Sequence, residues 1–203
     1  MAKRKKAQKP NASYEIQAVN FHPQTKRMLG FDPGSRNMGI SLAAANASNK
    51  VKIVANSIVT SPINDLVNFM PARLAFLEEV DRWVTTYQPH GFIAERFQTR
   101  GLLGPLVEQV SVMLGLLAGR YPHIPIKFIT AATWKNDYQR RFDFQLDAMY
   151  PVCQTTPHQL DASFISVYGL EKGLQRELDF TPQQIMHDAE VSSCVRLIKR
   201  KQK

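Results

Sequence analysis

Residues 30–42 read GFDPGSRNMGISL, and the rest of the fold can be worked out from this segment. An apolar run at residues 27–33 ends in Asp-Pro-Gly, and a second apolar run at residues 38–45 follows directly. Two apolar runs joined by a glycine-containing turn predict a β-hairpin. Asp32 is therefore expected at the end of the first strand, held rigidly at the start of a tight turn.

The elements that follow the hairpin alternate between strands and helices. β-branched residues alternate in VKIVANSIV, which predicts a third strand beside the hairpin. Apolar residues three and four positions apart then predict an amphipathic helix, which Pro71 can split or kink. In order, we expect a strand at 51–59, a helix at 63–87, a strand at 91–95, a helix at 105–121 and a strand at 126–129.

The C-terminal third of the chain is expected to be helical. Thr130 can cap a helix that carries Trp134, and residues 155–170 begin with cap residues and continue as a mostly apolar helix. A Thr-Pro pair at residues 181–182 opens a basic helix that runs toward Arg200. Three strands followed by β/α alternation imply an α/β fold, with a mixed five-stranded sheet and helices on both faces.

The net charge of +9 is concentrated at the two ends of the chain. Residues 1–27 hold seven Lys or Arg against one acid, residues 196–203 hold five against none, and residues 28–195 are left at −2. Residues 1–26 are expected to form a basic flexible arm, because a block of like charge cannot bury itself. Basic arms suit nucleic acid, since each neutralised phosphate releases counterions. Solvated tails that only serve solubility are the alternative.

Size, hydropathy and cysteine usage exclude several classes of protein. The 203 residues suit one domain with extensions, and no window has the roughly 18 apolar residues of a membrane span. The basic N-terminus lacks the apolar segment of a signal peptide. Cys153 and Cys194 fit neither a disulfide framework nor a zinc motif, so two reduced thiols are expected. The sequence therefore predicts a soluble, cytoplasmic protein.

Three acidic residues stand where apolar sequence would hold them firmly. Asp32 ends the first strand, Glu95 ends the apolar strand FIAE, and Asp161 lies early in an apolar helix. His158 precedes Asp161 by three residues, so both project from one face of that helix. Each position has an ordinary alternative, which is a turn former for Asp32, a salt bridge for Glu95 and a helix cap for His158.

Taken together, these acids predict a metal site. Clustered carboxylates repel one another and are stable only with a cation. Hard oxygen ligands select Mg²⁺ or Mn²⁺, which keep water ligands and accept phosphate oxygens. Two such ions about 4 Å apart can activate a water molecule and stabilise a leaving 3′ oxygen, which is the chemistry of phosphodiester hydrolysis.

Several segments resemble the motifs of a known nuclease family. They are GFDPGSRNMGISL around Asp32, FIAERF around Glu95, ITAATWK at 129–135, LDAMYP at 146–151 and HQLDASFISVYGL at 158–170. In their order and flanking sequence they resemble the RuvC-type Holliday junction resolvases of the ribonuclease H-like superfamily. The match spans residues 27–170, which we interpret as a nuclease domain, followed by a C-terminal helical basic extension at 171–203.

The resemblance implies a ribonuclease H-like fold and a homodimer with one active site per subunit, each holding two Mg²⁺ ions, with Mn²⁺ able to substitute. Asp32, Glu95 and Asp161 would be catalytic metal ligands. His158 would be an outer ligand or water activator, which the pKa range of histidine permits. The substrate would be branched DNA, above all a four-way junction, cut by paired nicks during DNA recombination and repair in a bacterial or phage-infected cytoplasm, at the nucleoid.

The chain also departs from the pattern of that family. The basic arm and the helix beyond residue 171 are additions, and His158 fills a fourth acidic position. Because of these departures, the resemblance leaves open which substrate the chain cuts and which residue is the fourth metal ligand.

Nucleic-acid contacts are expected around the acidic cluster. Arg96, Arg100 and Lys135, together with Arg36 in the turn, are candidates to hold phosphates. Phe97 is placed to stack on an unpaired base at the crossover of a junction. A core position in the following loop is the alternative for Phe97.

Residues 187–190 (HDAE) are a rival for the last acidic motif, because they also precede an apolar helical stretch. Asp188 would then replace Asp161 as a ligand. The segment HQLDASFISVYG fits better, since its spacing from Trp134 agrees with the family and its helix is less charged.

Two other functions fit parts of the sequence. The same carboxylates suit cleavage of the RNA strand in an RNA–DNA hybrid, as in ribonuclease H proper, although the turn after Asp32 and the segment ending in Lys135 favour the resolvase. A catalytically silent nucleic-acid-binding module would rely on the basic arms alone. The three intact acidic positions count against this silent module, because binding through the arms does not need them.

Overall fold

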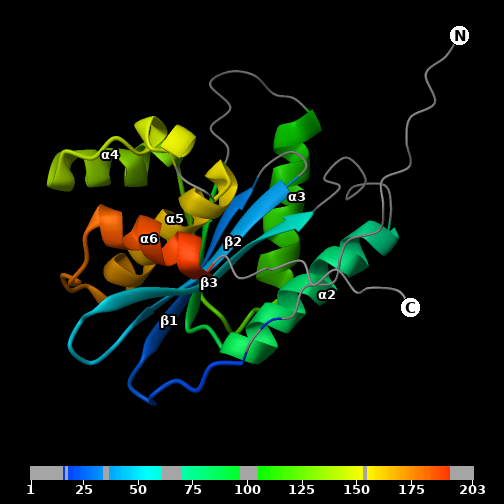
Figure 1. Ribbon diagram of the computed structural model, residues 1–203. Coiled ribbons are helices and arrows are strands. Elements are labelled where there is room, and N and C mark those ends of the chain that lie inside the picture. Colours follow the sequence, from blue (N-terminus) through cyan, green and yellow to red (C-terminus); the bar gives the residue numbers. More distant parts are fainter. Residues whose placement is uncertain are drawn as a thin grey trace, which may run out of the picture.

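One mixed β-sheet organises the molecule, in a computed structural model that describes residues 16, 18–33, 37–60, 70–96, 105–152 and 155–192. The strands are β1 (Lys26–Pro33), β2 (Asn37–Ala45), β3 (Val51–Thr60), β4 (Gly91–Glu95) and β5 (Ile126–Ile129). Their order across the sheet is β3-β2-β1-β4-β5, and Figure 1 labels the first three strands of the chain. The first three strands are antiparallel neighbours, whereas β4 runs parallel to β1 and β5 parallel to β4.

Helices cover both faces of this sheet. They are α2 (Met70–Tyr87), α3 (Pro105–Arg120), α4 (Ala131–Phe142), α5 (Pro157–Leu174) and α6 (Pro182–Ser192), with short 3₁₀ turns η1 (Leu146–Ala148) and η2 (Tyr150–Val152) between α4 and α5. Helices α2 and α3 pack on one face, and α4, α5 and α6 on the other (Figure 1). Among the described residues, no helix combines the length and apolar character needed to cross a membrane.

The predicted fold class is confirmed. The hairpin expected around residues 30–42 is present, with Asp32 opposite Gly39 in the antiparallel pair. All five expected strands form one mixed sheet with helices on both sides. Pro71 does not split α2, because it is the second residue of that helix, where a missing N–H costs no hydrogen bond. Residues 61–69, which belong to the expected helix at 63–87, lie outside the described residues.

The C-terminal elements differ slightly from the expectation. Helix α5 continues to Leu174, four residues past the predicted end of the domain at residue 170. Helix α6 is described as far as Ser192, and the remainder of the helix expected toward Arg200 lies outside the described residues. Helix α6 packs against the edge strand β3, where the side-chain amide of Asn56 donates to the carbonyl oxygen of Ala189.

Strand alternation places two of the predicted acids on the same face of the sheet. Phe31 of β1 and Ala94 of β4 are register partners, and both belong to the core beneath α2 and α3. Successive side chains of a strand point to opposite faces. The next residue of each strand, Asp32 and Glu95, therefore faces α5 at one end of the sheet.

Two glycines let α5 lie directly on the hairpin. A Cβ atom on Gly30 would come within 2.6 Å of the carbonyl oxygen of Ala162, and a Cβ atom on Gly39 would overlap the carbonyl oxygen of His158. No other residue type leaves room for so close an approach. The glycines thereby bring the first turn of α5 to the strand end that carries Asp32.

Candidate active site

Four predicted site residues converge where β1, β4 and the start of α5 meet. The imidazole Nδ1 of His158 lies 2.6 Å from Oδ2 of Asp32, which is almost completely buried. The charges of Asp32 and Glu95 both act on Asp161, so the three carboxylates lie close enough to interact electrostatically. The structure thus brings Asp32, Glu95, His158 and Asp161 together from segments far apart in the sequence.

The first turn of α5 is held by a capping box. Thr156 is the N-cap, and its hydroxyl accepts from the backbone N–H of Gln159, whose side chain in turn accepts from the backbone N–H of Thr156. The Gln159 amide also donates to the side chain of Asn56 on β3. Since Thr156 fills the cap position, His158 is free of that role and its ring is turned to Asp32.

The protonation of His158 follows from its acidic surroundings. The hydrogen bond to Asp32 raises the pKa of His158 above its usual range, and the charges of Asp32, Asp161 and Glu95 add to this effect while burial opposes it. A raised pKa means that the imidazolium form persists to higher pH than in an unperturbed histidine. In that form Nδ1 donates to Asp32 and Nε2 keeps a proton available for another acceptor.

Glu95 is held by the indole of Trp134. The Nε1–H of this fully buried tryptophan donates to Oε2 of Glu95 over 2.8 Å. Burial raises the pKa of Glu95, and the negative charge of Asp32 raises it further, whereas Trp134 and the cations Lys135 and His158 lower it. The carboxylate is therefore fixed in position but electrostatically costly, which is the usual condition of a functional acid.

Asp161 is the most perturbed acid of the group. The hydroxyl of Tyr150 donates to its Oδ1 over 2.5 Å, and Nζ of Lys135 lies 3.5 Å from its Oδ2. Burial raises the pKa of Asp161 to about 7, the charges of Asp32 and Glu95 contribute to the increase, and Lys135 and Tyr150 oppose it. At neutral pH this side chain is therefore close to half protonated.

Lys135 supplies positive charge next to these acids. Its Nζ donates to Oδ1 of Asp147 over 2.8 Å and to the hydroxyl of Tyr150 over 3.0 Å. Burial opposes the charge on Lys135, but the carboxylates of Asp161, Asp147 and Glu95 outweigh burial and raise the pKa of Lys135. The ammonium group is thus a permanent cation at the edge of the cluster.

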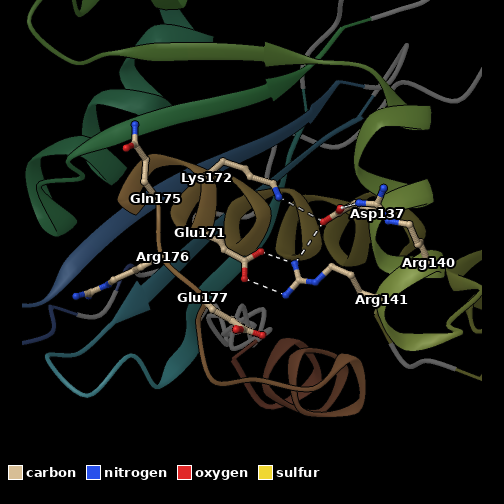
Figure 2. A pocket seen from close by; sticks show the side chains of 8 residues that line it. All are labelled: Asp137, Arg140, Arg141, Glu171, Lys172, Gln175, Arg176 and Glu177. Atoms are coloured by element: carbon tan, nitrogen blue, oxygen red, sulfur yellow. Dashed lines mark hydrogen bonds and ion pairs between the residues drawn. The ribbon is translucent and has the colours of Figure 1, made fainter.

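An ion-pair network fixes α4 relative to α5, behind the acidic cluster. Arg141 of α4 donates to both carboxylate oxygens of the buried Glu171 on α5, over 2.5 and 3.0 Å. Figure 2 shows this pair with Asp137, which accepts from Arg140 and Arg141 and lies 3.7 Å from Lys172 of α5. Because Lys135 belongs to α4 and Asp161 to α5, the network stabilises their relative position.

Two of the five residues predicted to contact nucleic acid lie in the described part of the chain. Arg96 directly follows Glu95, is exposed, and donates its backbone N–H to the carbonyl oxygen of Ile129. Lys135 lies at the cluster, as described above. The other predicted contacts, Arg36, Phe97 and Arg100, lie outside the described residues.

Asp188, the rival ligand, lies on α6 and contacts the edge strand β3. Its Oδ2 accepts from the backbone N–H of Ile53 over 3.3 Å. It is absent from the charges that shift the pKa of Asp161. Asp188 therefore has a structural partner of its own.

Sequence reasoning missed two members of this site, Tyr150 and Asp147. Both belong to the segment LDAMYP, which was interpreted only as part of the closing region of the domain. Their contacts with Lys135 and Asp161 depend on how η1 and η2 fold back against α4. The only sequence signal for these two residues was that an acid and a tyrosine lie close together in one short segment between two site motifs.

Comparison with known proteins identifies the fold. No family model and no curated protein matches this sequence. Among solved structures, RuvC of Thermus thermophilus in complex with Holliday junction substrate matches with a TM-score of 0.59 at 13% identity, over 76% of this chain and 99% of RuvC. A second structure of Thermus thermophilus RuvC gives a TM-score of 0.55 at 14% identity, with the same coverage. This chain has the RuvC fold.

A third solved structure also matches. The yeast mitochondrial Holliday junction resolvase Ydc2 has a TM-score of 0.46 at 16% identity, over 83% of this chain and 78% of Ydc2. The predicted RuvC-type, ribonuclease H-like fold is confirmed by the two Thermus thermophilus structures. The chemistry rests on the side chains described above.

The chemical types of the donor groups at this end of the RuvC fold suit a divalent cation. Three carboxylates and one imidazole are hard or borderline ligands, and the mutual repulsion that raises the pKa of Asp161 is what a cation relieves. Within the described ranges, no three His, Cys, Asp or Glu side chains are arranged to hold a metal as they stand. Trp134 and Tyr150 donate hydrogen bonds to Glu95 and Asp161, and His158 is hydrogen-bonded to Asp32. Lys135 forms an ion pair with Asp161, so metal binding requires that some of these contacts be exchanged.

Asp161 is expected to make the stability of the metal-free chain depend on pH. Its pKa is about 7 in the folded chain and near 3.8 when unperturbed, so the folded state binds the proton more tightly than the unfolded state. Stability therefore falls as the pH rises from about 4 to about 7. In EDTA, Asp161→Asn should raise the free energy of unfolding at pH 8 by about 3 kcal/mol and change it little at pH 4, as measured by urea denaturation.

Asp147→Asn is the matched control for this measurement. The hydrogen bond with Lys135 lowers the pKa of Asp147, so this variant should lose a little stability at pH 8 rather than gain it. An equal gain for Asp161→Asn at both pH values would contradict repulsion among the carboxylates as the cause.

Proposed function

We propose that this chain is a metal-dependent endonuclease that resolves four-way DNA junctions, and other branched DNA, by paired phosphodiester hydrolysis. The observation that carries the proposal is the convergence of Asp32, Glu95, His158 and Asp161 at one end of the sheet. Carboxylates that repel one another in a fixed site suit the binding of cations that act on phosphate. The RuvC fold, seen in a complex of Thermus thermophilus RuvC with Holliday junction substrate, supports this reading.

Asp32, Glu95 and Asp161 would hold Mg²⁺, with His158 as a further ligand or as a group that orients water. Bound Mg²⁺ ions would supply an activated water and a counter-charge for the leaving 3′ oxygen. The indole of Trp134 keeps Glu95 in one orientation. The capping box of α5 does the same for the helix turn that carries His158 and Asp161.

His158 and Lys135 complement the carboxylates. Protonated His158 donates Nδ1–H to Asp32 and can donate Nε2–H to a phosphate oxygen. Lys135 provides an ammonium group beside Asp161 that can attract the scissile phosphate. Arg96, which is exposed next to Glu95, extends the positive charge toward the flanking backbone of the DNA.

The proposed enzyme acts as a homodimer. A two-fold dimer presents two identical active sites, and a four-way junction offers two equivalent phosphodiesters. The basic ends of the chain, with seven and five Lys or Arg residues, would add sequence-independent affinity for the DNA backbone.

A substrate panel tests the proposal. We expect the protein with Mg²⁺ to cut an end-labelled four-way junction on two opposing strands at matching positions, leaving ligatable nicked duplexes, with linear duplex nearly untouched. The panel also holds flap and Y-shaped DNA and an RNA–DNA hybrid, and the products are resolved on denaturing gels. Preferential cutting of the RNA strand in the hybrid would replace the proposal by a ribonuclease H activity.

A further inference from the structure

A cavity of about 340 Å³ lies at the end of the sheet opposite the acidic cluster. It is formed by the first residues of β1 and β4, by β5 and by the last turns of α5. Six residue steps along β1 lead from Lys26, at its rim, to Asp32, which corresponds to about 20 Å along an extended strand. The cavity is therefore separate from the candidate active site.

The interior of this cavity is aliphatic. Met28, Ile93, Leu170 and Leu174 line it together with three glycines, Gly91, Gly169 and Gly173. Met28 and Leu174 are partly exposed, whereas Ile93 and Leu170 are buried. Phe92, the one phenyl ring among the lining residues in the described part of the chain, is only 1% exposed, and the imidazole of His90 lies at the exposed rim. The interior of the cavity therefore offers a nucleic-acid base no ring on which to stack.

The rim of the cavity is cationic. Lys26, Arg27, Lys127 and Lys172 line it, and no Asp or Glu does so among the described residues. The Nζ atom of Lys172 also lies 3.7 Å from Oδ2 of Asp137, which takes up part of its charge. No ion pair within the described ranges involves Lys26 or Lys127. The rim therefore presents positive charge from β1, β5 and α5 around a small apolar interior.

Two further observations describe the positive charge at this rim. The Nε atom of Arg27 is buried and has no hydrogen-bond partner within the described part of the chain, which is a costly state for a charged donor. Burial, together with the charges of Arg27 and Lys26, lowers the pKa of His90 on the same rim. The local potential is thus positive enough to disfavour a further cation.

The charge of the rim selects among the possible occupants. The basic segments at residues 3–9 and 196–203 would be repelled. The volume of about 340 Å³ accommodates an apolar side chain or two but not a folded surface. Cations from three separate elements require several negative charges outside the cavity, which a single small anion does not provide.

We propose that this cavity docks an acidic peptide segment of a partner protein, which inserts an apolar side chain beside Met28 and Leu174 and places carboxylates against Lys26, Arg27 and Lys127. An anchor side chain in a pocket, surrounded by charge pairs at the rim, is the usual arrangement of a peptide-binding hot spot.

Binding to the full-length chain tests the proposal. The probe is a pool of octapeptides composed of Asp and Glu with one central Leu, Ile or Phe, and the control pool has Ser at that position. The acidic apolar pool should give saturable shifts of the amide resonances of Gly91, Gly169 and Gly173 in ¹⁵N-labelled protein. The control pool should bind at least about tenfold more weakly, since it has no apolar side chain to bury in the cavity.

Charge-reversal variants locate the contacts. Lys26→Glu and Lys127→Glu should each weaken binding of the acidic apolar pool about tenfold or more. Lys52→Glu, which makes the same charge change at an exposed position of β3, should leave it unchanged. All three variants should keep wild-type thermal stability, because none of these side chains has a partner among the described contacts.

Several results would overturn the proposal. Equal binding of both pools, or no shift of the three glycine amides, would show that no apolar anchor enters the cavity. Displacement of the peptides by four-way junction DNA would assign the rim to nucleic acid. A change of oligomeric state in Lys127→Glu alone, measured by analytical ultracentrifugation, would assign it to a second copy of the chain.

Discussion

Asp161→Asn is expected to lower Mg²⁺-dependent cleavage of a four-way junction at least about 1000-fold, with junction affinity almost unchanged. Loss of a metal-binding carboxylate removes several kcal/mol of transition-state stabilisation, and each 1.4 kcal/mol corresponds to a factor of ten in rate. Affinity depends mainly on phosphate contacts, which this substitution leaves in place. Single-turnover cleavage and gel mobility shifts without divalent ions measure the two quantities. Asp32→Asn and Glu95→Gln should behave in the same way.

Asp188→Asn is the matched control for these variants, because it also neutralises a partly buried acid that lies before an apolar helical stretch. Its carboxylate accepts from the backbone of β3, so the variant should lose some stability and keep its cleavage rate. An inactive Asp188→Asn beside an active Asp161→Asn would move the last ligand to α6. His158→Ala should lower the rate in Mg²⁺ without changing junction affinity, since a water-orienting group acts on the chemical step.

Thermal shifts with added Mg²⁺ separate metal binding from catalysis. A cation at the acidic cluster should raise the Tm of the wild-type chain at pH 8, because binding to the folded state alone is stabilising. Asp161→Asn should respond much less. A Tm shift in the absence of any nuclease activity would support the metal site while contradicting the proposed function.

The parts of the fold that the sequence predicted are those with a local cause. The hairpin at residues 30–42 follows from two apolar runs and a turn, and α5 follows from its cap residues and apolar pattern. Asp32 and Glu95 were recognisable because a charged residue at the end of an apolar strand is out of character. Their placement side by side needed only strand alternation and the parallel pairing of β1 with β4.

The contacts around Lys135 could not be predicted in the same way. Its partners Asp147 and Tyr150 lie 12 and 15 residues further along the chain, beyond the reach of helical or strand periodicity. The pair of Arg141 and Glu171 spans 30 residues and links two helices. Such contacts depend on how the helices pack. An apolar pattern predicts which face of a helix is buried, but not which residues that face contacts.

Gly39 provides the last test, because it links the hairpin to the geometry of the site. Gly39→Ala would place a methyl group on the carbonyl carbon and oxygen of His158, so the first turn of α5 has to move away from β2. Overpacking of this kind costs about 1–3 kcal/mol, and a shift of about 1 Å in a catalytic group can reduce the rate about 100-fold. We therefore expect Gly39→Ala to lower both Tm and cleavage per folded molecule, the latter about 100-fold.

Gly115→Ala is the matched control, since no atom lies within 4 Å of a Cβ atom at this exposed position of α3. Replacing a helical glycine by alanine should stabilise the chain by up to about 1 kcal/mol and leave cleavage unchanged. Cleavage is compared at a temperature where circular dichroism shows both variants to be folded, so that the rate reports on the site and not on unfolding. If Gly39→Ala cleaves junctions at the wild-type rate with an unchanged Tm, β2 does not position His158 and Asp161, and the close approach of α5 to the hairpin has no part in the chemistry.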